Sequence, residues 1–190
     1  MPLSTPVSRL PLHHRAISTR GYRRDDGLFE VEAHLHDTKD IPFKLVSGEK
    51  PAGASVHSMW LRMTYDVSLT IVDAEAAMDA MPYQDYCEKI TPKYKQLIGM
   101  TMRPGFGERV RKTFAGTKGC THLTDLIGIA ATTAFQSLAG QVTQDQASKP
   151  FQLDRCHALA TNGAAVIRYY PAWVRGDISL TDMHHDAKTK

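Results

Sequence analysis

The stretch GTKGCTHLTDLIGIAATTAFQSLAG, residues 116–140, carries the strongest helical pattern in the chain. Its apolar residues recur three and four positions apart, as on one face of an amphipathic helix. They are Leu123, Leu126, Ile127, Ala130, Ala131, Ala134, Phe135 and Leu138. Thr121 could cap the start of such a helix, and Gly140 stands where a left-handed cap would end it. The spacing therefore predicts one long helix.

Cys120 and His122 stand at the entrance of this helix. The unpaired N–H groups and the macrodipole at a helix N-terminus favour the thiolate form of a cysteine placed there. The strongest predicted element thus delivers two metal ligands or reactive groups at its tip.

The 190 residues are enough for one sizeable core, and we expect a single domain over residues 1–190. Residues 1–12 are expected to form an N-terminal arm and residues 177–190 a charged tail. No apolar run approaches the ~18 residues of a membrane span, and the N-terminus lacks the order of a signal peptide. These features favour a cytoplasmic protein without a membrane partner.

The net charge of +3 is too small and too dispersed for a nucleic-acid-binding surface. The expected partners are therefore a small-molecule substrate and, as an option, further copies of the chain in a homo-oligomer. The three cysteines, Cys87, Cys120 and Cys156, are an odd number spread widely along the chain. In a reducing compartment this favours free thiols or metal ligands over disulfides.

Strand patterns fill the first half of the chain and helical patterns the second. Strands are expected at residues 13–22, 28–38, 42–46, 56–65 and 69–74, and residues 75–81 fit either a strand or a helix. Further helices are expected at residues 91–99 and 104–115, and residues 164–170 fit either type. This order indicates an α+β fold, in which an antiparallel sheet from the N-terminal half is packed by helices from the C-terminal half.

The strand at residues 28–38 ends in a group of titratable side chains. Glu32, His34 and Asp37 are candidate catalytic residues, because a carboxylate beside a histidine can act as a general base. The alternative is the solvent-exposed face that alternation produces in any one-sided antiparallel sheet.

Two further groups suggest binding. Cys87, Cys120, His122 and Cys156 are candidate ligands of a divalent metal, zinc or iron, since these metals take thiolate and imidazole. The alternative is a set of buried, inert thiols. Arg23, Arg24 and Arg62 could hold a substrate carboxylate or phosphate by paired hydrogen bonds, or could simply be solvated.

The motifs GYRRDDGLFEVEAHLHDTK, MWLRMTYD, AMDAMPYQDYC, GCTHLTDLIGIAATTAFQ and CHAL occur in this order. In them the chain resembles, over nearly its whole length, a bacterial family known as a domain of unknown function. The resemblance implies one fold unit and a place among genes for the catabolism of aromatic or acyl compounds. The matching positions are Arg23, Arg24, Asp26, Gly27, Glu32, His34, Asp37, Cys87, Gly119, Cys120, His122, Cys156 and His157.

A second resemblance concerns architecture. From Trp60 to Gly140 the order of hairpin, cysteine, helices and a cysteine at a helix tip is similar to the NifU-like iron–sulfur scaffold domain. That likeness implies a site for zinc or a nascent cluster, although Cys87 lies in DYCEK rather than in the Gly-Cys-Gly motif of that family.

Three functions therefore remain open. The leading hypothesis is a small metal- or thiol-dependent enzyme, of lyase or hydrolase type, that acts on an anionic small molecule. The alternative is a zinc or iron–sulfur scaffold without catalysis. A third is a binding protein whose thiols belong to the core.

Overall fold

The computed structural model describes residues 3–46, 48–141 and 149–175. Within the expected N-terminal arm, the described residues are exposed and form no helix or strand. The expected charged tail lies outside the described residues.

The chain forms two compact units, residues 1–142 and residues 143–190. The single domain expected over the whole chain therefore stays a prediction.

The first unit is built on a four-stranded antiparallel sheet. Its strands are β1 (His14–Arg23), β2 (Phe29–Thr38), β5 (Ser55–Tyr65) and β6 (Ile71–Ala80), in the order β1-β2-β5-β6. A turn at Gly27, whose φ of 85° suits glycine, joins β1 to β2. A short hairpin of β3 (Phe43–Leu45) and β4 (Gly48–Lys50) precedes β5. Residues 75–81, which fitted either type of element, fall almost entirely in β6 because they pair with β5.

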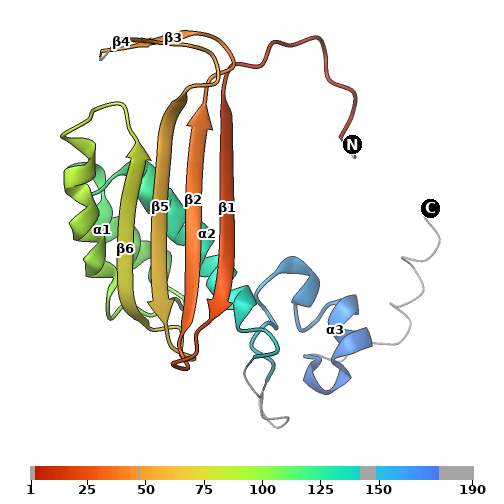
Figure 1. The fold of residues 1–190 in the computed structure, drawn as a ribbon. Helices are drawn as coiled ribbons and strands as arrows, with labels where there is room; N and C mark the ends of the chain where they lie inside the picture. Colours follow the sequence, from red (N-terminus) through yellow and green to blue (C-terminus); the bar gives the residue numbers. More distant parts are fainter. Residues whose placement is uncertain (1–2, 47, 142–148, 176–190) are drawn as a thin grey trace. The chain divides into compact units, whose positions relative to one another are not determined.

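Helices cover one face of this sheet, as Figure 1 shows for α1 (Phe106–Phe114) and α2 (Thr121–Ser137). The odd-numbered residues from Phe29 to Asp37 in β2 and from His57 to Tyr65 in β5 point to this covered face, and most are buried and apolar. The even-numbered ones are mainly polar and lie on the other face, which we call the open face. The α+β prediction is thus confirmed.

The helix α2 packs through the apolar stripe that the sequence predicts. Leu123, Leu126, Ile127, Ala130 and Ala134 are fully buried. Leu123, Leu126 and Ile127 alone are expected to contribute about 1.5–3 kcal/mol each by burial. The N-cap is Cys120 rather than Thr121, so the cysteine stands directly at the helix entrance.

The helix expected at residues 91–99 begins earlier and winds more tightly. Residues Cys87–Leu97 form the 3₁₀ helix η1, with Pro92 inside it instead of at its start. The hydroxyl of Thr91 donates to the carbonyl oxygen of Glu88, so Thr91 does not cap a helix that begins after it.

The second unit is small. Its elements are the short 3₁₀ helices η3 (His157–Leu159) and η4 (Pro171–Trp173) and the helix α3 (Ala164–Tyr169), so residues 164–170 are mainly helical. In the described part of both units, no helix has the length and hydropathy needed to cross a membrane.

Candidate metal centre

Asp37 lies at the end of β2, on the face covered by helices. Alternation along the strand places it after Leu35, Ala33 and Val31, all of which are fully buried. Its side chain is only 1% exposed. A buried carboxylate is stable only when it is paired, and Arg15 on β1 supplies the pair. Arg15 Nε donates to Oδ1 at 2.8 Å and Nη2 donates to Oδ2 at 2.7 Å.

His57 is the second member of the group. It lies on β5 directly opposite Asp37 in the antiparallel register, so both side chains project from the same face. His57 Nδ1 lies 3.0 Å from Asp37 Oδ2. The side chain is 13% exposed and therefore nearly enclosed.

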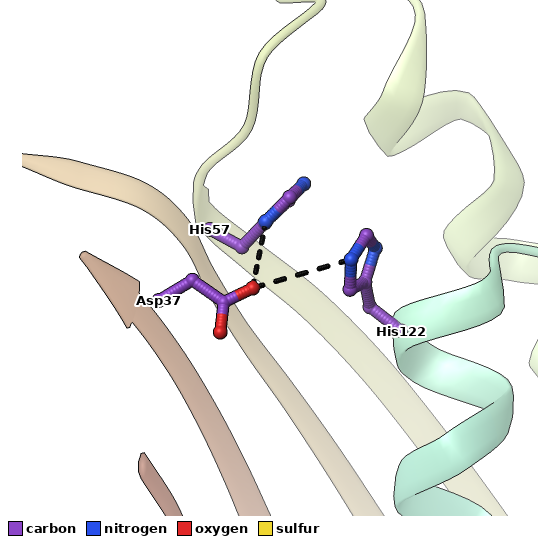
Figure 2. Close-up of side chains that lie close together, drawn as sticks. All are labelled: Asp37, His57 and His122. Carbon is purple, nitrogen blue, oxygen red and sulfur yellow. Dashed lines mark hydrogen bonds and ion pairs between the residues drawn. The ribbon is translucent and has the colours of Figure 1, made fainter. Parts of the chain in front are cut away.

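His122 joins the group from the first turn of α2. Figure 2 shows its ring facing Asp37 beside the ring of His57. The two ring centroids are 3.8 Å apart, and His122 Nε2 lies 4.0 Å from Asp37 Oδ2. One quarter of the His122 side chain is exposed, which opens the group to solvent on this side.

The start of α2 is fixed by Tyr94 of η1. The Tyr94 hydroxyl accepts a hydrogen bond from the N–H of Cys120 at 2.9 Å and donates to the Cys120 carbonyl at 3.0 Å. This places Cys120 Sγ 3.9 Å from Nδ1 of His122 and 4.0 Å from Met59 Sδ. The thiol therefore flanks the ring nitrogen of His122 that does not face Asp37.

Burial and hydrogen bonding shift the titration of all three residues. Burial alone would raise the pKa of Asp37, but the hydrogen bonds from Arg15 and His57 outweigh it and hold this pKa at about 2. Burial is the main cause that lowers the pKa of His57, which the hydrogen bond to Asp37 offsets in part. Burial and then the neighbouring His57 lower the pKa of His122. At neutral pH the group is a carboxylate with two uncharged imidazoles, the protonation state that binds metal.

The three side chains could hold one metal ion. One donor atom from each of Asp37, His57 and His122 lies within 4.8 Å of the other two. Tetrahedral zinc with ligands at about 2.1 Å requires donor separations of roughly 3.4 Å, so small side-chain movements would close the group on an ion. A carboxylate has about four lone-pair positions, of which Arg15 takes one on each oxygen and the hydrogen bond with His57 takes a second on Oδ2. A metal would therefore take the place of the proton shared between His57 and Oδ2.

The structure does not bring the three predicted catalytic residues together in one cluster. Glu32 and His34 have even numbers in β2, so their side chains lie on the open face, opposite to Asp37. Glu32 accepts hydrogen bonds from Arg62, and His34 stacks on Trp60 with ring centroids 3.8 Å apart. Only Asp37 of the three approaches His122.

The predicted substrate-binding arginines do not converge on the centre either. Arg24 pairs with Asp26 in the β1–β2 turn, and Arg23 is an exposed residue at the end of β1. Arg62 lies on the open face, where it pairs with Glu32 and Glu75.

Of the four predicted metal ligands, only His122 belongs to the three-residue group. Cys120 flanks it, and Cys87 lies at the start of η1. Cys156 is exposed and belongs to the second compact unit. None of the three cysteines forms a disulfide.

His57 and Arg15 were not among the site residues predicted from the sequence. A signal for His57 was present, because it shares one face of β5 with Met59, Leu61 and Met63. A histidine at the end of an apolar strand face is a buried polar residue that needs a partner. Asp37 carries the same signal at the end of the apolar face of β2. Arg15 carries none, since its strand is exposed along nearly its whole length.

No curated protein and no solved structure matched the chain, so the likeness to NifU-like scaffolds has no support from these comparisons. A family match exists and spans Arg15, Asp37, His57 and His122. Residues 13–136 match the family described as a protein of unknown function, DUF2889, and the chain therefore belongs to that family.

Proposed function

We propose that the protein is a metal-dependent enzyme of hydrolase or lyase type, whose centre is formed by Asp37, His57 and His122. The observation that carries this proposal is the gathering of two imidazoles and a buried carboxylate from three elements far apart in sequence. Zinc and ferrous iron both accept such a donor set, so either metal fits.

The number of ligands favours catalysis over a structural role. Structural zinc sites are closed by four protein ligands, whereas catalytic sites use three and keep one position open. The partial exposure of His122 leaves a route for a small molecule to that position. A metal bound there would act as a Lewis acid and lower the pKa of a bound water.

The scaffold alternative has less support. A scaffold of the NifU-like type would need three cysteines, and the described site offers only Cys120 at its edge. The Sγ atom of Cys120 approaches Nδ1 of His122, while Nε2 of the same ring faces Asp37. Glu32 and His34 have no role in the proposed centre, because their side chains lie on the opposite face of the sheet.

Metal analysis of protein purified without chelator tests the proposal. We expect about one zinc or iron per chain in the wild type, and a loss of most of it in His57→Ala and His122→Ala. His36→Ala is the matched control, because His36 lies on the open face and contacts Ser55 instead. A chain that stays metal-free, or variants that keep the wild-type content, would contradict the proposed centre.

Two additional measurements refine the assignment. Cys120→Ser should keep the metal, and the cobalt-substituted protein should show no thiolate-to-cobalt charge-transfer band. A panel of small esters, amides and hydroxy acids should then reveal turnover that is lost on chelation and restored by metal. Metal binding without any metal-dependent turnover would favour the scaffold or binding-protein alternative.

A further inference from the structure

Resting on the metal centre proposed above, we infer that its ligand is a small oxyanion, a carboxylate or a phosphoryl group, held between the metal and Arg15. Recognition of the anionic substrate is thereby assigned to Arg15, a residue that the sequence pattern did not single out. It differs from the expectation that Arg23, Arg24 and Arg62 bind the anion.

The hydrogen bonds of Arg15 leave half of its binding capacity unused. A guanidinium group has two edges that can each grip an oxyanion with two N–H donors. Arg15 uses the Nε and Nη2 edge on Asp37. The other edge, formed by Nη1 and the second proton of Nη2, makes no hydrogen bond or ion pair to the described residues. It matches the geometry of a carboxylate or a phosphoryl group.

Nη2, the nitrogen that belongs to both edges, lies next to the proposed metal position. One oxygen, Asp37 Oδ2, is the meeting point of Arg15 Nη2 at 2.7 Å, His57 Nδ1 at 3.0 Å and His122 Nε2 at 4.0 Å. A group in the open position of the metal would therefore be a neighbour of the guanidinium. The Arg15 side chain is 36% exposed although the carboxylate beneath it is buried, so a ligand from solvent can reach it.

The charge of the centre also favours an anion. Metal-bound imidazoles are neutral, and the negative charge of Asp37 is offset by Arg15. Besides Asp37, the carboxylate of Asp125 on α2 interacts electrostatically with both Arg15 and His122. On the solvent side, His13 Nε2 lies 3.5 Å from Asp37 Oδ1. With neutral histidines, a divalent ion would leave a net charge of about +1 for a ligand to balance.

The test uses the full chain loaded with cobalt, whose visible spectrum reports a change of ligand. Acetate and inorganic phosphate are titrated into the protein, with acetamide as the neutral counterpart of acetate. At least one anion should change the spectrum saturably, and acetamide should not. Arg15→Met should weaken the binding of this anion at least tenfold. Arg15→Lys should weaken it less, since lysine keeps the positive charge but loses the paired N–H donors of the guanidinium group. Arg20→Met is the control, because Arg20 lies on β1 opposite Glu32, on the open face.

The outcomes separate the two proposals. If the wild type binds no metal, the metal centre and the inference both fail. If metal binds but neither anion changes the spectrum, or acetamide competes equally, the inference is overturned and the centre stands. If Arg15→Met loses the metal, the anion titration is repeated with Arg15→Lys. An anion affinity equal to that of the wild type in Arg15→Lys would overturn the role of Arg15.

Discussion

At the scale of single residues, the candidate centre depends on how one buried carboxylate is satisfied. Asp37 is almost fully enclosed, and an unpaired charge in such a place would cost several kcal/mol. Its two oxygens accept both donors from Arg15, and Oδ2 also meets His57. Asp37 is therefore a structural link between β1, β2 and β5 as well as a metal ligand in the proposed centre.

Asp37→Asn should remove both functions. The amide keeps the shape of the side chain but loses the charge, so Arg15 and His57 face an NH₂ group or a neutral oxygen. We expect a loss of roughly 2–4 kcal/mol in the free energy of unfolding and of most of the bound metal. Urea unfolding and metal analysis measure the two effects.

The matched control is Asp26→Asn, which breaks the exposed pair with Arg24 in the β1–β2 turn. Exposed ion pairs contribute little, so this variant should keep its metal and unfold near the wild-type midpoint. Equal behaviour of the two variants would show that burial does not give Asp37 a special role.

The same carboxylate predicts how stability depends on pH. Its pKa is about 2 in the folded protein against an ordinary 3.8, so between these values the unfolded chain binds more protons. The contribution of ionised Asp37 to the free energy of unfolding is complete above about pH 4. It falls by roughly 2 kcal/mol in all as the pH decreases toward 2. When metal-free protein is unfolded with urea at pH values from 5 to 2, the free energies of unfolding of the wild type and of Asp37→Asn should converge as the pH falls. Parallel curves would contradict the shifted pKa.

At the scale of elements, the approach of α1 to the start of α2 places the ligand His122. Gly119 lies between the two helices, and a Cβ atom there would be 2.7 Å from the carbonyl oxygen of Phe114 and 2.8 Å from its Cβ. Since the first of these atoms is backbone, a larger residue would displace the chain that leads into α2. The glycine is needed here for close approach.

Gly119→Ala should therefore destabilise the protein by about 1–3 kcal/mol and weaken metal binding, because the first turn of α2 shifts. Gly128→Ala, in the middle of the same helix, is the control. A Cβ atom at Gly128 meets nothing within 4 Å, and alanine should stabilise the helix by up to about 1 kcal/mol. Thermal unfolding checks both signs, and a neutral Gly119→Ala would refute the close-approach argument.

At the scale of the whole molecule, the centre lies entirely within the first compact unit. The family match at residues 13–136 falls inside this unit, which ends at residue 142. The sheet and its covering helices α1 and α2 are complete within the same range. The proposed chemistry should thus need nothing from residues 143–190.

A chain that ends after Gln141 should fold cooperatively and bind the same amount of metal as the full chain. Circular dichroism during heating and metal analysis measure the two properties. In the full chain, Cys156→Ser should likewise leave the metal content unchanged. If the shortened chain fails to fold, the single domain predicted from the sequence is the better description, and loss of metal in Cys156→Ser would restore that cysteine as a ligand.

Much of the fold was readable from local patterns. The alternation at residues 28–38 and 56–65 and the three- and four-residue spacing after His122 predicted the strands and α2, because side-chain periodicity follows backbone geometry directly. The 3₁₀ helix η1 was not predicted in its observed form. Its tighter winding and earlier start were not distinguishable from an ordinary helix on propensity alone.

The sequence by itself determined which residues face the core, and hence that Asp37 and His57 end two apolar strand faces. Only the tertiary structure decided that these ends meet each other, His122 and Arg15. The antiparallel register sets Asp37 opposite His57, and the packing of α2 on the sheet brings in a residue more than eighty positions from Asp37. Periodicity is a local property of the chain, whereas strand register and helix docking depend on contacts between distant segments, so no local pattern could have specified this group.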